Sequence, residues 1–317
     1  MTRLINLKKP KKWSVKEFLL KRKEVLIFRG MGGLGDLLMH RMMFEDFKLI
    51  NPDIRLVCAC PPQYKDALID HPFLDEVRNC KETFLDDYLI WFNTTHACGR
   101  YEISKAPFAD KHRSDIWAEH CGVKLTKHNM HINLTDEEKK RGIEYIEKIR
   151  INNGPSVVLC PKSAMASKNL LPNQIKDLTK AVLDMNYFIF GLHHSPIKEL
   201  NDLKIPCIYD VKIRDWMSII WAADYVISVD TSAFHFAGGI GKPLTGIFTW
   251  ADGKVYGKYF DFFLVQKHRD NGDWGCGPCY NYGICPLTKN QIKPCLTNIT
   301  SEMIINSVIK MFIKWPK

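Results

Sequence analysis

Short apolar runs alternate with longer amphipathic stretches along most of the chain. Runs rich in Val, Ile, Leu and Phe predict buried strands at 24–28, 54–60, 155–160, 186–191 and 225–230, with a shorter strand at 205–209. Helical spacing is found at 37–50, 62–70, 112–123, 137–150 and 214–224, and after Pro172. Strands that alternate with helices of this length predict an α/β fold, in which parallel sheets carry helices on both faces.

The alternation is interrupted at 125–137, where LTKHNMHINLTDE is polar and unpatterned. A chain of 317 residues suits two domains of about 150 residues each. We therefore predict an N-terminal Rossmann-like domain at 1–150 and a C-terminal Rossmann-like domain at 151–317, facing each other across a cleft. Ligands of open parallel sheets bind beyond the carboxyl ends of the strands, so the loops after Phe28, Cys160, Phe190 and Val229 are expected to line that cleft.

The first of these loops is rich in glycine and ends in Asp36, directly before a predicted helix. Backbone N–H groups in such a turn can face an anion or a reacting hydroxyl, although similar turns are common in α/β proteins in general. The run also fits the dinucleotide pattern G-x-G-x-x-G through Gly30, Gly32 and Gly35. That pattern needs an acidic residue at the end of the second strand, which here ends in CAC at 58–60, so we expect no NAD.

Two later loops also carry reactive groups. The loop at 161–172 offers two hydroxyls and an ammonium group near a helix start, a natural clamp for a diphosphate, from Ser163, Ser167 and Lys168. The loop at 228–243 places four polar side chains between a strand and the first turn of a helix, namely Asp230, Thr231, Ser232 and His235. Asp230 and the hydroxyls could equally cap that helix, and His235 alone could be a packed core histidine.

The motifs GGLGD followed by LL, SxxxSK followed by a proline, and VDTSxxHxAGGIGKP occur in this order and resemble those of the heptosyltransferase-type glycosyltransferases, family nine of the sugar transferases. The resemblance extends over about residues 24–310 and implies the GT-B architecture, a nucleotide-activated donor such as ADP-heptose, and inversion at the anomeric carbon without a metal. It implies that Asp36 is the general base and that Lys168 neutralises the leaving diphosphate. It also implies that Ser163 contacts the phosphate and that the donor's sugar and diphosphate are held by the segment with Asp230, Thr231, Ser232 and His235. We expect the donor-binding site to include, in addition, four residues of the neighbouring loops, Gly33, Gly35, Ser167 and His193.

Two positions depart from the family's pattern. Where the family usually has an acidic residue after the strand that ends FIFG, this chain has Leu192, His193 and His194, which leaves the nucleotide open. Ser232 replaces the more usual glycine, which leaves the sugar open.

A cysteine-rich segment at 274–296 contains Cys276, Cys279, Cys285 and Cys295, spaced C-x2-C-x5-C-x9-C. Four thiolates brought together by tight turns predict a closed tetrahedral site for one structural Zn or Fe. This segment, here called the cysteine finger, is similar to the iron-binding finger of the autotransporter heptosyltransferases. The alternatives are a cysteine-rich loop without metal, or disulfides in an exported protein.

Lys and Arg exceed Asp and Glu by 45 to 35, which gives a formal charge of +10 and favours an acidic partner. No apolar run reaches the ~20 residues that a membrane-spanning helix needs, and the first residues contain no apolar signal core, so we expect a cytoplasmic protein, with contact to the inner membrane surface as an option. The leading hypothesis is an inverting transferase whose acceptor is a glycan, a lipopolysaccharide core or a protein hydroxyl. One alternative is the same chemistry on a modified base in phage-type DNA. Another is a non-catalytic nucleic-acid-binding protein that uses the cysteine finger and the basic N-terminal arm. The oligomeric state stays open.

Overall fold

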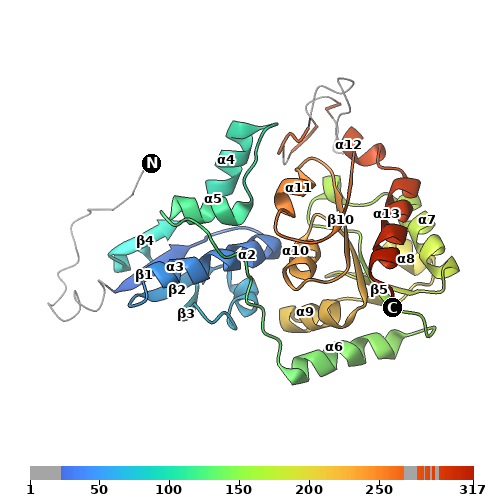
Figure 1. Ribbon diagram of the computed structural model, residues 1–317, viewed down its shortest axis with the longest axis horizontal. Helices are drawn as coiled ribbons and strands as arrows, with labels where there is room; N and C mark the ends of the chain where they lie inside the picture. Colours follow the sequence, from blue (N-terminus) through green and yellow to red (C-terminus); the bar gives the residue numbers. More distant parts are fainter. Residues whose placement is uncertain (1–22, 268–276, 282, 286–287, 290–292) are drawn as a thin grey trace. The chain divides into compact units, whose positions relative to one another are not determined.

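A computed structural model describes residues 23–267, 277–281, 283–285, 288–289 and 293–317. The chain divides into two compact units (Figure 1). The first unit contains the described residues up to Tyr101 together with Arg113–Asn133, and the second contains Glu102–His112 and Leu134–Lys317. Each unit has one parallel sheet, which confirms the predicted pair of Rossmann-like parallel-sheet domains.

The first unit has a four-stranded sheet in the order β3-β2-β1-β4. Its strands are β1 (Glu24–Phe28), β2 (Arg55–Cys60), β3 (Glu76–Asn79) and β4 (Ile90–Asn93), and its helices include α2 (Leu34–His40), α3 (Phe44–Ile50) and α5 (Arg113–His120). The chain proceeds outward from β1 to β3 and then returns to the other side of β1 with β4. The order in which strands are added to the sheet therefore reverses between β1 and β4, although all strands are parallel. Open α/β sheets form their binding sites at such a reversal point.

The second unit has a six-stranded sheet in the order β10-β9-β8-β5-β6-β7. Its strands are β5 (Ser156–Cys160), β6 (Phe188–Leu192), β7 (Cys207–Ile208), β8 (Tyr225–Val229), β9 (Leu244–Phe248) and β10 (Phe263–Gln266). Its helices are α6 (Asp136–Ile149), α7 (Pro172–Asp184), α8 (Lys198–Asp202), α9 (Ile213–Ala222), α10 (Ser232–Gly239), α11 (Gly253–Tyr256), α12 (Pro294–Thr297) and α13 (Ser301–Lys314). The reversal in this sheet lies between β5 and β8, whose residues are almost completely buried.

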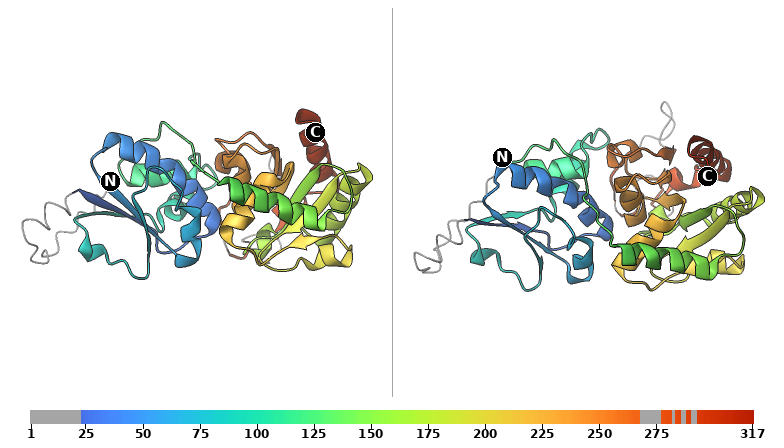
Figure 2. Two further views of the ribbon diagram at one scale, coloured as in Figure 1. Left: turned by 90° about the horizontal axis from the view of Figure 1, so that it is seen from below. Right: turned by 60° about the horizontal axis from the view of Figure 1, so that its bottom comes forward.

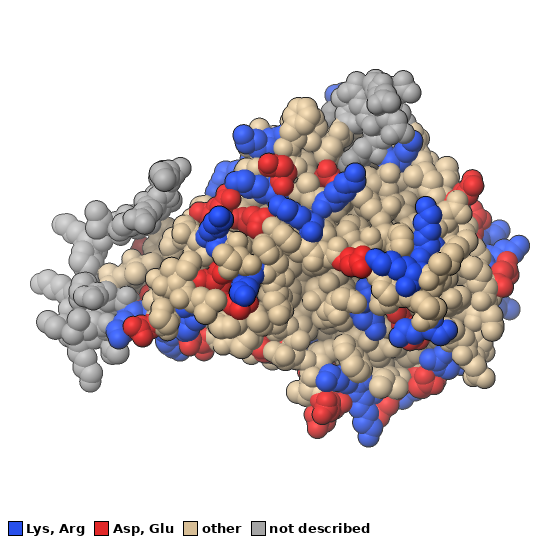
Figure 3. All heavy atoms as spheres, in the orientation of Figure 1, with Lys and Arg blue, Asp and Glu red and all other residues tan. Residues whose placement is uncertain are grey.

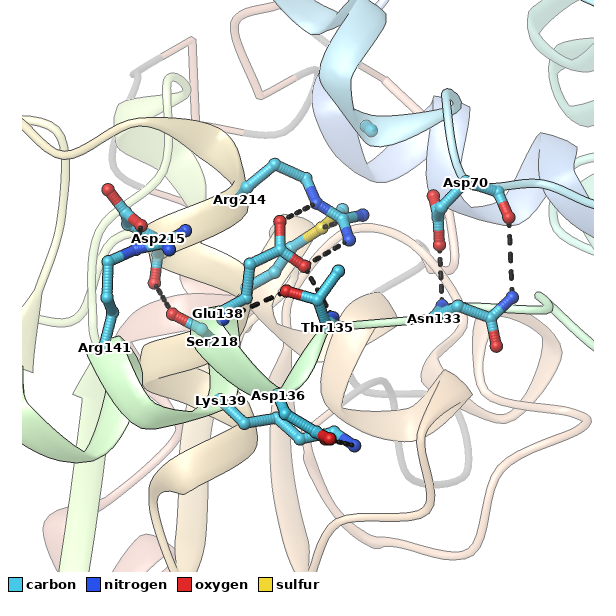
Figure 4. Close-up of polar contacts among 12 residues, drawn as sticks. Asp70, Asn133, Thr135, Asp136, Glu138, Lys139, Arg141, Arg214, Asp215 and Ser218 are labelled. Atoms are coloured by element: carbon cyan, nitrogen blue, oxygen red, sulfur yellow. Dashed lines mark hydrogen bonds and ion pairs between the residues drawn. The ribbon is translucent and has the colours of Figure 1, made fainter.

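Helix α6 packs along α9, and the two run side by side in Figures 1 and 2. Gly142 permits this approach, because a Cβ atom there would lie 2.2 Å from the Ser218 carbonyl oxygen. Both carboxylate oxygens of Glu138 accept hydrogen bonds of 2.7 Å from Arg214, and Arg141 pairs with Asp215 (Figure 4). Helix α6 therefore belongs to the second unit.

Most predicted elements are present, with local differences. The stretch 37–50 is not one helix, since a 3₁₀ turn at Arg41–Met43 separates α2 from α3. The predicted helical segment at 62–70 is present as a 3₁₀ helix, Pro62–Ala67. The pattern gave no indication of β3, of α4 (Ala97–Lys105) or of α13. No described helix is both long and apolar enough to cross a membrane.

Candidate functional site

Asp36 lies in the first turn of α2, directly after the glycine-rich loop that follows β1. Its carboxylate Oδ2 accepts the backbone N–H of Gly33, the N-cap residue, at 3.3 Å. The neighbouring strand contributes as well, because the hydroxyl oxygen of Thr95, which follows β4, accepts the backbone N–H of Gly30 at 3.0 Å. The reversal point of the first sheet thus carries the carboxylate that we predict to be the base.

Two arginines hold this carboxylate. Arg29 Nη2 lies 2.8 Å from Asp36 Oδ2, and Arg113 Nη1 lies 2.6 Å from Oδ1. The Arg29 guanidinium also lies over the Trp117 ring, 4.6 Å from its centroid. Burial alone would raise the pKa of Asp36, but the two guanidinium groups and the Gly33 N–H outweigh it and hold that pKa well below its usual range. Asp36 is therefore ionised at physiological pH.

Gly32 is the glycine that this geometry requires most strictly. Its φ of +131° is a conformation that side chains rarely adopt, and a Cβ atom would lie 2.5 Å from Arg29 Nη2 and 2.9 Å from Asp36 Oδ2. At Gly33, by contrast, a Cβ atom would meet no atom within 4 Å. The absence of a side chain at position 32 therefore allows the Arg29–Asp36 pair to form against the backbone.

Lys168 and Asp230 meet at the reversal point of the second sheet. Lys168 follows β5 and Asp230 follows β8, and Lys168 Nζ lies 2.7 Å from Asp230 Oδ2. Both side chains are largely buried, with 15% and 6% of their surfaces exposed. Burial would raise the pKa of Asp230, but the Lys168 ammonium and His235 hold it well below its usual range. The two predicted donor-site residues thus form one ion pair.

The loop before α10 does not use its acidic side chain as a helix cap. Thr231 is the N-cap residue, and its hydroxyl makes no capping hydrogen bond, while Asp230 pairs with Lys168 instead. His235 Nε2 lies 3.7 Å from Asp230 Oδ1, so the histidine in the first turn joins the same cluster. The backbone N–H groups at the start of α10, where Ser232 is half-buried, lie directly after this cluster.

The remaining predicted donor residues lie in loops of the second unit, apart from the two glycines of the first unit. Ser163 is engaged locally, because its hydroxyl donates to the Met165 carbonyl at 3.0 Å. Ser167 is 7% exposed, and its backbone carbonyl accepts the Thr249 hydroxyl. His193 follows β6, and its Nδ1 lies 3.2 Å from the Ser195 hydroxyl; burial and the neighbouring His194 lower its pKa. Gly35 lies inside α2 in the first unit.

Several residues at these sites escaped the sequence pattern. Arg29 and Arg113, which pair with Asp36, lie in stretches that we identified only as part of a strand–turn run and as a helix. Trp250 follows β9, and its ring centroid lies 4.8 Å from Lys168 Nζ. A basic residue directly after a buried strand, as at Arg29, is the signal that could have indicated the first of these.

The cysteine finger is described only in part. Cys276 lies outside the described residues, whereas Cys285 is buried and Cys279 and Cys295 are half-buried. Within the parts of the chain that are described, no three His, Cys, Asp or Glu side chains are grouped so that they could hold a metal. The metal site therefore stays a prediction from the cysteine spacing.

Charged side chains of both signs are interspersed on the face drawn in Figure 3. A nucleic-acid-binding surface is expected to show Lys and Arg gathered into a stripe along the phosphate path. The described residues of this face form no such stripe, so this view gives no support to the nucleic-acid alternatives.

Comparisons with known proteins identify the fold. No family model and no curated protein sequence matches the chain. Solved structures do match: ADP-heptose lipopolysaccharide heptosyltransferase II of E. coli has a TM-score of 0.67 at 12% identity, covering 92% of this chain and 99% of that one. A glycosyl transferase of family 9 from Veillonella parvula has a TM-score of 0.66 at 12% identity, covering 92% and 98%. The iron-containing dodecameric glycosyltransferase TibC of enterotoxigenic E. coli has a TM-score of 0.68 at 13% identity, covering 92% and 76%.

At these identities the likeness shows a common fold. The chain has the two parallel-sheet domains of the GT-B heptosyltransferase structures, as the sequence predicts. The roles of individual residues do not follow from the likeness, and they are argued from the two sites themselves.

Proposed function

We propose that this chain is an inverting glycosyltransferase that moves a sugar, a heptose or another, from a nucleotide-activated donor to an acceptor hydroxyl. One observation carries the proposal. The reversal point of each sheet holds a reactive group of the kind that this reaction needs, Asp36 in the first unit and the Lys168–Asp230 pair in the second. The GT-B fold common to the chain and ADP-heptose-dependent heptosyltransferase II supports it.

The proposed reaction needs a carboxylate beside the acceptor hydroxyl and a positive charge beside the leaving diphosphate. The acceptor oxygen forms a bond to the anomeric carbon while Asp36 takes the hydroxyl proton, and the bond from that carbon to the diphosphate oxygen breaks with its electron pair staying on the phosphate. Lys168 and the N–H groups at the start of α10 neutralise the negative charge that develops on the leaving diphosphate. We further propose that Ser163, Ser167, His193, Thr231, Ser232 and His235 contact the donor, and that Gly33 and Gly35 shape the turn beside it.

The ion pairs of Asp36 set a condition on the base role. A carboxylate with both oxygens held by guanidinium groups is ionised but weakly basic, since the arginines stabilise its charged form. Proton transfer is favoured when at least one pair loosens as the acceptor binds. Arg113 is the more accessible partner, with 11% of its side chain exposed against 5% for Arg29.

Thermal unfolding against a panel of nucleoside diphosphates and sugar nucleotides tests the donor class first. A ligand that binds only the folded chain raises the melting temperature by an amount that grows with its affinity. Failure of every nucleoside diphosphate to shift the melting temperature would reject the proposal.

Asp36→Asn then tests the base, with the donor found in that screen and a labelled sugar. We expect transfer to be lost while donor affinity stays close to the parent's, because the amide keeps the shape but cannot take the proton. The variant's melting temperature serves as the control for folding, since the change removes the partner of two arginines. Unchanged turnover would exclude Asp36 as the base.

The metal in the cysteine finger is a separate part of the proposal. Cys276, Cys279, Cys285 and Cys295 would hold one Zn or Fe as a structural ion, because an all-thiolate set leaves no open position for substrate. Elemental analysis of the purified chain is expected to find about one metal per chain, and Cys279→Ser to lower stability before activity. A stable chain without metal would refute the site.

The acceptor is proposed as a hydroxyl on a glycan, a lipopolysaccharide core or a protein. A labelled-sugar assay against each class separates them. Transfer to DNA would instead support the modified-base alternative, and acceptor binding would then weaken steeply with salt.

A further inference from the structure

Trp250 connects the donor site of the second unit to the cysteine finger. It is 1% exposed, and its ring is close to two ammonium groups, one from a residue earlier in the sequence and one from a residue later in the sequence. Lys168 Nζ lies 4.8 Å from the centroid of the indole ring, and Lys293 Nζ lies 5.5 Å from it. On the finger side, the Trp250 carbonyl accepts the backbone N–H of Tyr280 at 3.2 Å.

Lys293 is a buried cation that pairs with no carboxylate in the described part of the chain. It is 1% exposed, lies directly before α12, and its ammonium donates to the Asn281 backbone carbonyl. Among the described residues no Asp or Glu forms an ion pair with it, whereas the charge of Lys168 is matched by Asp230. A buried ammonium loses its hydration, and the face of an indole ring offsets this loss only in part.

Among the described Lys, Arg, Asp and Glu side chains that contact the Trp250 ring or pair with those that do, there are two ammonium groups, of Lys168 and Lys293, and one carboxylate, of Asp230. An anion that binds beside Lys168 would be attracted by both ammonium groups, because a charge in a largely buried cluster acts over several ångströms with little screening.

We propose that Lys293 is a positioning residue of the donor site, which supplies a second positive charge for the donor diphosphate from its place beside the Trp250 ring. Its 1% exposure means that it acts through the ring and through the field at Lys168 and does not touch the ligand. The cysteine finger then contributes to donor binding as well as to stability. This inference rests on the proposed function, because it takes the ligand to be a nucleoside diphosphate.

Lys293→Gln tests the charge with little change in shape, because the amide can still donate to the Asn281 carbonyl. Lys293→Arg keeps the charge. Lys139→Gln is a matched control, since Lys139 Nζ lies 5.6 Å from the Trp221 ring in the α6–α9 pair and is already paired with Asp136 (Figure 4). Calorimetric titration of each folded variant would use the nucleoside diphosphate found in the thermal screen and the corresponding uncharged nucleoside.

We expect Lys293→Gln to bind the nucleoside diphosphate about tenfold more weakly than the parent and the nucleoside equally well, because only the former carries the charge that Lys293 attracts. Lys293→Arg and Lys139→Gln are expected to match the parent. Equal diphosphate affinity in Lys293→Gln and the parent would overturn the inference, as would an equal loss for both ligands, which would show a purely structural role. A parent chain that binds neither ligand would instead reject the proposed function.

A second variant decides the matter if Lys293→Gln does not fold. Trp250→Phe keeps an aromatic face but weakens the contact with both ammonium groups. We expect it to lower the preference for the diphosphate over the nucleoside several-fold, and an unchanged preference would overturn the inference.

Discussion

Arg113 sets the basicity of Asp36, and its replacement should appear directly in the pH dependence of the reaction. Arg113→Gln removes the guanidinium that lies 2.6 Å from Asp36 Oδ1 and leaves Arg29 on Oδ2. An opposite charge at this distance lowers a carboxyl pKa by about 1–3, equivalent to roughly 1.5–4 kcal/mol. We therefore expect the pKa of Asp36 to rise by about that amount in the variant.

The assay is the pH profile of kcat/KM with the donor identified by thermal unfolding. As the proposed base, Asp36 must be ionised to accept the acceptor's proton, so the rate is expected to fall as the pH drops through the pKa of its carboxyl group. The acid limb of the variant is expected about 1–3 pH units above that of the parent, and Arg113→Lys, which keeps a positive charge, should move it less. Arg141→Gln is the matched control, because it breaks an Arg–Asp pair in the α6–α9 contact of the second unit. Coincident acid limbs in the parent and Arg113→Gln would refute the reasoning.

Urea unfolding checks the same pair without any substrate. The folded-state pKa of Asp36 lies below its unfolded value, so this group contributes stability above about pH 4, and the contribution is lost as the pH falls through the folded-state pKa. Arg113→Gln should therefore lower the free energy of unfolding at pH 7, and the difference from the parent should shrink as the solution is acidified below pH ~4. A difference that is independent of pH would mean that lost packing, and not the ion pair, explains the change.

Three further substitutions, with Gly99→Ala as a control, separate the charges of the proposed donor site from the packing of the second unit. Lys168→Ala should weaken nucleoside diphosphate binding at least tenfold in calorimetric titration, because it removes the attractive charge and leaves Asp230 to repel the phosphates; equal affinity in variant and parent would exclude the clamp. Asp230→Asn should lower the free energy of unfolding by about 3 kcal/mol, since it leaves Lys168 buried without its partner. It should also strengthen diphosphate binding, because no carboxylate then competes with the phosphates for Lys168. Weaker binding would contradict the argument. Gly142→Ala should lower the free energy of unfolding by about 2–4 kcal/mol, because its Cβ atom would lie 2.2 Å from the Ser218 carbonyl oxygen. The control Gly99→Ala in α4 meets no atom within 4 Å, so it should leave the stability unchanged or raise it. Similar stabilities of the two variants would show that α6 can move away from α9.

The sequence was informative about the strands and the loops that follow them. Apolar runs bounded by turns locate β1, β5, β6 and β8, and the rule that ligands bind beyond the carboxyl ends of parallel strands selects the loops of Asp36, Lys168 and Asp230. Edge strand β3 was missed because its sequence, EVRN, is mostly polar and only half-buried. At Pro62–Ala67 the pattern predicted a helical segment but not its 3₁₀ type, because a local pattern does not show which carbonyl each N–H will reach.

The partners of the charged residues were beyond the reach of a sequence pattern. Arg113 comes to Asp36 from a helix distant in sequence, and Asp230 reaches Lys168 because β5 and β8 are neighbours in the sheet although β6 and β7 separate them along the chain. The loop motifs suggested a base and a clamp, each expected to face a ligand. In the structure both groups are instead engaged with oppositely charged side chains of their own unit.

This compensation of charge has a consequence for how substrates would bind. The charges of Asp36 and Lys168 are compensated in the absence of any ligand. Two arginines pair with Asp36, and Asp230 pairs with Lys168, so each buried charge has its counter-ion. A diphosphate or an acceptor would then have to exchange these internal pairs for new ones, and its affinity would reflect only the difference between the two sets. Asp230→Asn and Lys168→Ala change opposite sides of that exchange, so their effects on diphosphate affinity must differ in sign if charge governs binding. If shape governed it, both substitutions would weaken binding by disturbing the same loop.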